Sequence, residues 1–218
     1  MMIVSFSTGI AAAMVLGLFS CSMIDQEIDL IYEGPPGKAR APIGEVAVVV
    51  GNSSQMIQRD GKSWVIGNVK NGVGIETADL LTQDDPYYWV AAALATELQA
   101  VGFVAPLFRQ PPSTGLWVNV DLQNFWVEQD TGVFSTGAIS NITILYSLYQ
   151  GDVLIAALES TKSRNRDEFN ASPMAGALGV AFGGQGSAEN KAISISNCLR
   201  STLLQAIPEL ITFIETTK

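Results

Sequence analysis

Cys21 is the residue whose surroundings point most directly to a chemical modification. It closes the string Leu18-Phe19-Ser20-Cys21, at the end of an uncharged apolar stretch that begins at Met1. This arrangement resembles a bacterial lipobox, where a signal peptidase cuts before a cysteine that then carries lipid. We therefore expect residues 1–20 to be removed and Cys21 to be lipidated. An uncleaved membrane anchor is the alternative, because no Lys or Arg precedes the apolar run and Phe19 is unusual inside a lipobox.

The charge of the chain restricts its partners. Twelve Lys and Arg residues stand against 21 Asp and Glu residues, for a net charge of −9. Such a chain lacks the basic footprint of a nucleic-acid-binding protein and is repelled by anionic lipid head groups. Attachment to a membrane must therefore come from the N-terminal lipid or from apolar surface. Ser22 after the cysteine resembles the class that is exported onward, which favours the periplasmic face of the outer membrane.

The chain contains no histidine, which excludes Ser-His-Asp and Cys-His catalysis and histidine-ligated metals. Asp84 and Asp85 precede Pro86 and indicate a helix cap rather than a catalytic pair. Cys198 falls on the apolar stripe of an expected helix, which favours a buried side chain over a reactive thiol. We accordingly expect no catalytic residue, no metal site and no cofactor, and an enzyme acting on cell-wall sugars is the least favoured hypothesis.

An uncharged Gly- and Ala-rich stretch at residues 172–187 is the most unusual internal segment. Its glycines approximate the spacing that allows helices to pack closely, so the stretch is a candidate oligomer, partner or membrane contact. The alternative is a flexible loop. The candidate contact residues in this stretch are Met174, Leu178, Val180 and Phe182.

Aromatic residues on one expected strand are a second candidate for a partner contact. Trp117 falls on the polar face of that strand, and Trp126 follows at its end. Aromatic side chains are enriched at binding hot spots. The alternative is that they cover the second face of the sheet.

The domain organisation follows from composition. Residues 21–42 contain Gly34-Pro35-Pro36-Gly37 and are predicted to be the lipidated cysteine followed by an extended tether. The remaining residues, 43–218, are of a size that suits a single periplasmic domain with its own core.

Periodicity within 43–218 predicts a series of strands and helices. We expect a buried strand at 45–50, a hairpin at 56–70 that turns at Asp60-Gly61, and a helix that begins at Asp84 or Asp85 and stops at Gly102. A short strand at 103–105, three antiparallel strands near 116–123, 142–148 and 153–158, and a helix from about Ala188 should follow. Pro208 should kink or end that last helix.

This order of strand, arm, helix, three strands and helix favours an α+β fold. We expect a two-layer sandwich whose sheet is mostly antiparallel and carries both helices on one face. Several strings within it resemble the YajG-like family of bacterial lipoproteins, namely Val46–Val50, Ile66-Gly67-Asn68-Val69, Ala100-Val101-Gly102-Phe103, the alternating strand Leu116–Gln123 and the late amphipathic helix.

The resemblance covers about residues 43–214 and the lipobox, and residues 172–187 depart from it. It implies an outer-membrane lipoprotein with a compact βα-sandwich and no assigned enzymatic activity. The sequence therefore favours a non-enzymatic module that binds an envelope protein or associates with itself. A subunit of an oligomeric secretion or surface-assembly complex, with 172–187 at the contact, is the alternative.

Overall fold

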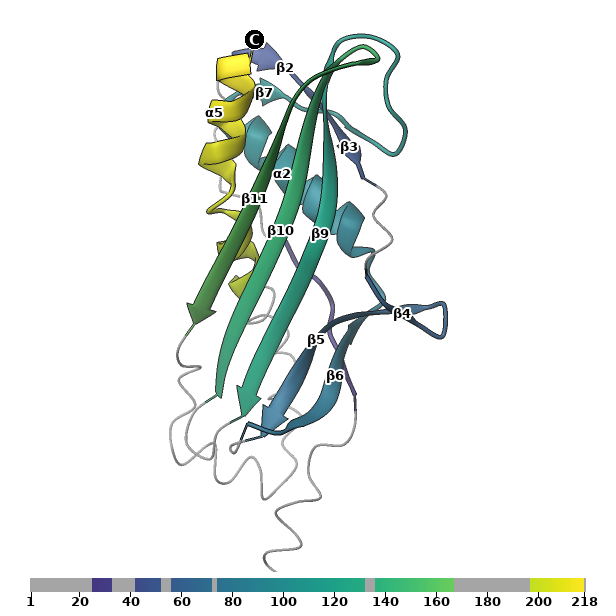
Figure 1. The fold of residues 1–218 in the computed structure, drawn as a ribbon, viewed down its shortest axis with the longest axis vertical. Helices are drawn as coiled ribbons and strands as arrows, with labels where there is room; N and C mark the ends of the chain where they lie inside the picture. The colour runs from purple at the N-terminus through teal and green to yellow at the C-terminus, as the bar shows by residue number, and fades with distance from the viewer. Residues whose placement is uncertain are drawn as a thin grey trace, which may run out of the picture.

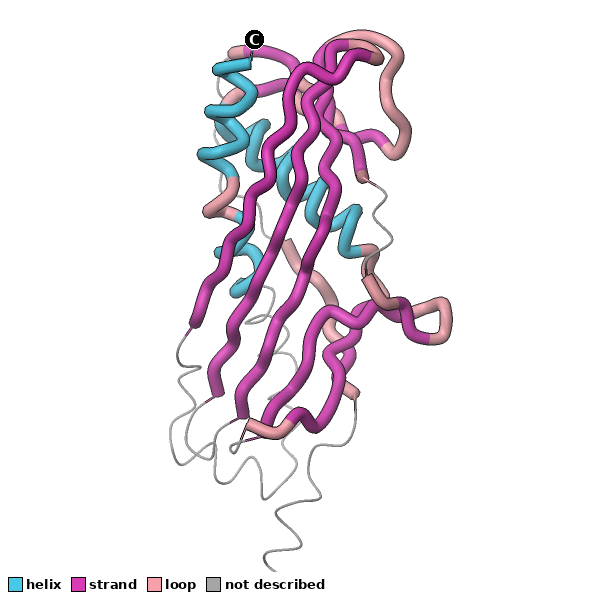
Figure 2. Tube along the Cα trace, in the orientation of Figure 1, coloured by secondary structure: helices cyan, strands magenta, loops and turns pink. Residues whose placement is uncertain are grey.

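The computed structural model describes residues 25–32, 42–51, 56–71, 74–131, 136–166 and 197–217. These ranges form an α+β structure dominated by strands (Figures 1 and 2). The expected α+β class is therefore confirmed. The elements are, in chain order, β1 (Gln26–Glu27), β2 (Gly44–Glu45), β3 (Ala47–Val50), β4 (Gln58–Arg59), β5 (Ser63–Asn71), β6 (Glu76–Thr82), α2 (Pro86–Val101), β7 (Phe103–Val104), β8 (Leu107–Phe108), β9 (Leu116–Thr131), β10 (Thr136–Gln150), β11 (Val153–Arg166) and α5 (Ile207–Thr217).

The main sheet is mixed and curled, which corrects the expectation of a mostly antiparallel two-layer sandwich. Its strands follow the order β1-β6-β5-β9-β10-β11, with β3 also paired to β9. The pairs β9–β10, β10–β11 and β5–β6 are antiparallel, as short connections require. The pairs β1–β6, β3–β9 and β5–β9 are parallel. These parallel pairs join segments far apart in the sequence, which the alternation within each strand does not predict.

The three long strands carry the core on one face. Val118, Val120 and Leu122 of β9 are buried, as their alternation predicts. The β9–β10 register shifts between Thr143 and Ile144, so the buried positions of β9 continue with Phe125 and Val127. β9 runs to Thr131, well beyond its expected end at residue 123.

Helix α2 begins and ends as expected. Asp85 is the N-cap, and its Oδ1 accepts hydrogen bonds from the backbone N–H groups of Tyr87 and Tyr88 at 3.1 and 3.2 Å. Gly102 ends the helix with φ of 108°, a left-handed conformation that glycine adopts without strain. Val90, Leu94 and Leu98 are all fully buried.

The C-terminal helical region is interrupted just before Pro208. Residues 197–203 are helical, residues 204–206 form a turn, and α5 begins at Ile207. Pro208 therefore lies in the first turn of α5, where its missing N–H costs nothing. The expected stripe is confirmed for its described members, since Cys198, Leu199, Thr202, Leu203 and Ala206 are all buried. Ile195 lies outside the described residues.

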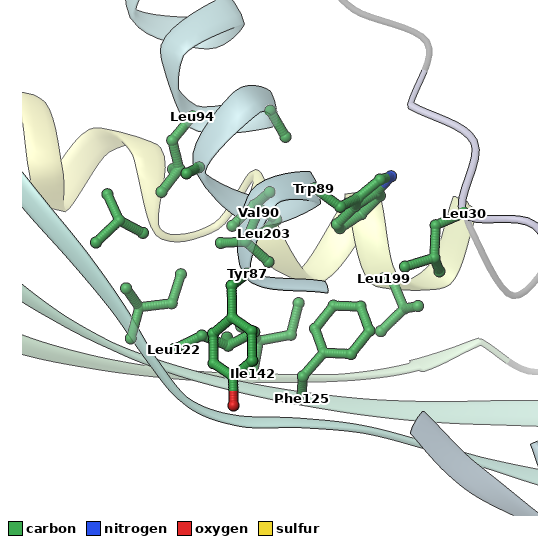
Figure 3. Close-up of a cluster of buried hydrophobic side chains, with 14 of the residues drawn as sticks. Leu30, Tyr87, Trp89, Val90, Leu94, Leu122, Phe125, Ile142, Leu199 and Leu203 are labelled. Atoms are coloured by element: carbon green, nitrogen blue, oxygen red, sulfur yellow. The ribbon is translucent and has the colours of Figure 1, made fainter. Parts of the chain in front are cut away.

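The helices and the core face of the sheet enclose one continuous apolar cluster. Figure 3 shows Trp89, Val90 and Leu94 from α2 with Leu199 and Leu203, above Leu122, Phe125 and Ile142 of the sheet. Both helices thus pack on the same face, as expected. A separate small cluster on the second face contains Ala47, Val49 and Trp117, with Tyr149 packed against them.

Residues 25–32 pack on the domain, although they were expected to belong to the tether. β1 pairs with β6, and Ile28 and Leu30 are only 4% and 8% exposed. Leu30 N also donates a 2.7 Å hydrogen bond to Asp84 Oδ2. Within this part, Gln26 and Glu27 form a short strand at the edge of the sheet.

The hairpin formed by β4 and β5 turns where the sequence predicted. Asp60 and Gly61 have φ of 54° and 64°, as a type I′ turn requires. The strand β6 was not expected from the sequence. It pairs with β5, whose Gly67 lies against Val127 of β9.

Candidate functional site

The outer edge of β11 carries three consecutive exposed apolar side chains. Val153, Leu154 and Ile155 are 67%, 52% and 42% exposed, and they are consecutive, so their side chains project from both faces of the sheet. Among the described residues, β11 pairs with β10 alone. Its other edge therefore presents backbone N–H and C=O groups together with apolar side chains. An edge of this kind is a template for pairing with another strand.

A shallow apolar groove lies between β11 and α5. Its volume is about 410 Å³, and it is lined by Leu158, Pro208, Glu209, Thr212, Phe213 and Thr216. Polar contacts fix the two walls, because Glu209 pairs with Lys162 and accepts a 2.7 Å hydrogen bond from Ser160 Oγ. The hydrogen bonds from Lys162 and Ser160 lower the pKa of Glu209.

A second concavity, of about 300 Å³, lies where residues 30–32 cross the start of α2. Aromatic residues line it with two carboxylates, but both carboxylates already have structural partners. Asp84 accepts a hydrogen bond from Leu30 N, and Asp85 caps α2 and lies 3.5 Å from Arg109 Nη1. The interpretation of this pair as a helix cap is therefore confirmed for Asp85, whereas Asp84 holds the backbone of Leu30.

Buried polar groups beside this concavity hold the N-terminal segment on α2. Tyr32 Oη donates a hydrogen bond to Glu97, and the Tyr32 ring packs edge-on against Trp89. Burial and the neighbouring Glu97 carboxylate raise the pKa of Tyr32. This cluster joins the segment around Tyr32 to α2.

The first described residue, Asp25, is held by the β4–β5 hairpin. Its Oδ2 pairs with Arg59, whose other terminal nitrogen, Nη2, lies 2.7 Å from Asp79 Oδ2. Asp25 Oδ1 also accepts a hydrogen bond from Asp79 N at 3.1 Å. Asp25 is four residues after Cys21. The contact with Asp25 therefore places the hairpin beside a residue that is close in sequence to the candidate lipidation site.

The structure places only two of the candidate site residues. Cys21, Met174, Leu178, Val180 and Phe182 lie outside the described residues. Trp117 is 6% exposed, stacks on Tyr149 with ring centroids 4.1 Å apart, and donates a 2.7 Å hydrogen bond to Gly151 O. It covers the second face of the sheet, which was the alternative interpretation. Trp126 is half-buried on β9.

Two features of the candidate surfaces were missed. The apolar run from Val153 to Leu158 predicts a strand, and nothing within the run indicates that one edge of this strand is exposed. Arg59 and Asp25 are separated by 34 positions, and no local pattern predicts their contact.

The described ranges contain neither a membrane-spanning helix nor a candidate metal cluster. No helix there is long and apolar enough to cross a membrane. No cluster of three or more Cys, Asp or Glu side chains that could hold a metal ion occurs there either.

No protein-family model and no curated protein matches the chain, so membership of the YajG-like family is not confirmed. Among solved structures, a DUF330 protein from Xanthomonas campestris shares 13% identity, covering 86% of this chain and 92% of its own, with a TM-score of 0.42. A neuraminyllactose-binding hemagglutinin homologue from Helicobacter pylori shares 10% identity, covering 85% and 98%, with a TM-score of 0.32. A minor lipoprotein from Acinetobacter baumannii shares 12%, covering 62% and 90%, with a TM-score of 0.26. Likenesses at these scores assign no function to this chain.

Proposed function

We propose that this chain is a lipid-anchored protein on the periplasmic face of the outer membrane that binds an envelope protein partner and catalyses no reaction. Cys21 carries the lipid, and the domain presents the outer edge of β11 to the partner. The proposal agrees with the resemblance to the YajG-like family, which implies an outer-membrane lipoprotein with no assigned enzymatic activity.

The exposed apolar edge of β11 is the observation that carries the binding role. An added strand would pair with the backbone groups of this edge, which face no other strand in the described part of the chain, and would cover Val153, Leu154 and Ile155, whose exposure otherwise favours aggregation. The neighbouring groove along α5 could take an apolar side chain of the same partner. Main-chain pairing gives affinity in this mode of recognition, and side-chain pockets give specificity.

Site-specific photo-crosslinking in intact cells tests the binding surface. A photoreactive residue at position 154 should give a discrete crosslinked product, whereas one at Ile75, which is 60% exposed on another part of the molecule, should not. The lysine variant Ile155→Lys should abolish the product from position 154. Equal products from positions 154 and 75, or a product insensitive to Ile155→Lys, would contradict the proposal.

The mass of the product separates the two kinds of partner. A product of twice the chain mass that contains only this sequence indicates self-association, whereas a second sequence identifies an envelope protein. Self-association through residues 172–187 makes a different prediction. A chain lacking residues 174–186 should then lose its oligomeric state but keep the crosslink from position 154.

The anchor is tested at Cys21. The Cys21→Ser chain should leave the outer-membrane fraction, and mass spectrometry of the wild-type N-terminal peptide should show an acylated cysteine and no residues 1–20. More than one acyl chain is needed for lasting attachment, at about 0.8 kcal/mol per buried CH₂ group. A Cys21→Ser chain that still fractionates with the outer membrane would overturn the anchor.

A further inference from the structure

We infer that the β4–β5 hairpin is the surface that the domain turns toward the lipid bilayer. The inference rests on the proposed lipidation of Cys21 and adds an orientation to it. The surface consists of Ile57, Arg59 and the turn residues Asp60, Gly61 and Lys62.

The first step is the distance between the lipid and the domain. Only residues 22–24 separate Cys21 from Asp25. Four residue steps span at most about 14 Å when the chain is fully extended. A tether that ran to residue 42 would have allowed many orientations, but the packing of residues 25–32 removes that freedom.

The second step is the position of the hairpin beside the point where the tether ends. Arg59 contacts both Asp25 and Asp79, so Asp25, the hairpin and β6 form one unit. Ile57 extends the β4–β5 ladder, because its carbonyl accepts a 2.9 Å hydrogen bond from Val65 N. Side chains two residues apart on a strand lie on the same side. The side chain of Ile57 therefore lies on the same side of the hairpin as the side chain of Arg59, which contacts Asp25.

The third step is the chemistry of the surface. Ile57 is 68% exposed, the most exposed of the large apolar side chains in the described part of the chain, and Lys62 is exposed at the turn. An apolar side chain beside a long cationic one suits a bilayer interface, where the apolar part enters the acyl boundary and the ammonium reaches phosphate. The type I′ turn keeps this hairpin tip narrow.

The orientation also directs the partner surface away from lipid. In Figure 1 the hairpin projects from the lower half of the molecule, whereas β11 begins at the upper end. The exposed residues Val153, Leu154 and Ile155 would therefore point into the periplasm. A domain oriented in this way can contact the bilayer through the hairpin and bind a partner strand along β11 at the same time.

Lipid-quenching measurements on the full lipidated chain test the inference. Ile57→Cys and Val153→Cys form a matched pair, because the native side chains are 68% and 67% exposed. Each variant is labelled with a fluorophore; Cys198 is fully buried, and Cys21 carries lipid, so neither should react. In vesicles of phosphatidylethanolamine and phosphatidylglycerol with brominated acyl chains, the label at position 57 should be quenched several-fold more than the label at 153. Equal quenching, or stronger quenching at 153, would overturn the inference.

A spacer variant checks that the short connection is the cause. About 20 Gly and Ser residues inserted after Ser22 give a mean span of roughly 25 Å. Quenching at position 57 should then fall to the level seen at 153 while the chain stays on the vesicles. Persistence of the full quenching would overturn the short connection as its cause. Mass spectrometry of the N-terminal peptide separates the two proposals, since an unlipidated Cys21 refutes the anchor itself, whereas a lipidated chain without preferential quenching refutes only the orientation.

Discussion

Arg59 contacts both Asp25 and Asp79 and so holds the first described residue of the chain on the rim of the sheet. The contact spans 34 positions between Asp25 and Arg59. Because of this contact, Asp25 belongs to the domain and not to the expected tether. The contact also places the β4–β5 hairpin next to a residue four positions from the candidate lipidation site, Cys21. The distance from lipid to domain therefore depends on the packing of residues 25–32 as well as on the length of the chain.

Replacing Arg59 with alanine should loosen the start of this segment without unfolding the domain. The ion pair is about two-fifths exposed on each side, so its loss should cost no more than about 1 kcal/mol. Amide hydrogen exchange of residues 26–28 should accelerate, because the edge strand β1 frays more readily. Arg109→Ala removes another exposed pair, with Asp85, and should leave exchange at 26–28 unchanged. Equal effects of the two variants would argue against the contact.

Leu30→Ala tests whether residues 25–32 belong to the core. Leu30 is 8% exposed and lies in the main cluster, so truncation should lower the free energy of unfolding by about 2–4 kcal/mol. Its neighbour Ile31 is 45% exposed, and Ile31→Ala should cost under about 0.5 kcal/mol. Urea denaturation of the two variants measures the difference. Two equally small effects would restore the free tether that the composition predicted.

Local features of the fold could be predicted from the sequence because their determinants are close together in it. Asp85 marks the start of α2 through its side-chain cap, and Gly102 marks the end through its left-handed backbone conformation. Each of these signals depends on a single residue. The turn at Asp60 and Gly61 depends on the same kind of local preference. The parallel pairing of β5 with β9 has no such determinant, because strands with the same alternation can pair in several orders. The periodicity of the sequence therefore could not predict that the sheet is mixed.

The candidate surfaces were less predictable than the elements. An apolar run such as Val153–Leu158 has the same composition in a core strand as on an exposed edge, and only the strand order shows that β11 is an edge. Trp117 fell on the expected face of its strand, but β3 pairs with that part of β9 and Tyr149 stacks on the ring. Exposure depends on neighbours that are distant in sequence, so a position in a strand does not determine it.

Gly67→Ala should separate β5 from β9. A Cβ atom at this position would lie 1.8 Å from Val127 O, a contact that only movement of the backbone can relieve. We expect a loss of at least about 3 kcal/mol in the free energy of unfolding. Gly61→Ala is the matched control, because nothing lies within 4 Å of its Cβ and only the strain of its φ of +64° remains, at about 1–2 kcal/mol. Chemical denaturation should rank the two variants in that order, and the reverse order would contradict the close approach of the strands.

Glu209→Gln tests the contact between α5 and β11 through its pH dependence. Lys162 and Ser160 lower the pKa of Glu209 below its ordinary value of 4.5. A carboxylate with a lowered pKa in the folded state stabilises the fold above its unfolded pKa, and this contribution is lost as pH falls through the folded pKa. The wild-type chain should therefore exceed the variant in stability near neutral pH, by no more than about 1 kcal/mol because the pair is partly exposed. The difference should disappear in strong acid, and a difference that is independent of pH would contradict this role of Glu209.

Tyr146→Phe should stabilise the domain near neutral pH. Tyr146 is fully buried, and its hydroxyl has no hydrogen-bond partner within the described part of the chain, so removing the hydroxyl relieves a desolvation cost of about 1–3 kcal/mol. Tyr32→Phe is the matched control, and the same deletion should destabilise there because Tyr32 Oη donates to Glu97. Urea denaturation near neutral pH measures both changes, and a destabilised Tyr146→Phe chain would show that the hydroxyl has a partner.

The same two variants should differ from the wild-type chain in alkali. Burial raises the pKa of Tyr146 above its ordinary value of 10.0, and burial with Glu97 does the same for Tyr32. The folded state then keeps these protons while the unfolded state releases them, so stability falls as pH rises above the unfolded pKa. Each phenylalanine variant removes one ionisable group and should reduce the slope of this loss. Denaturation at a series of pH values above 10 should therefore give the steepest decline for the wild-type chain, and a slope unchanged by Tyr146→Phe would mean that its hydroxyl ionises as readily in the folded chain as in the unfolded one.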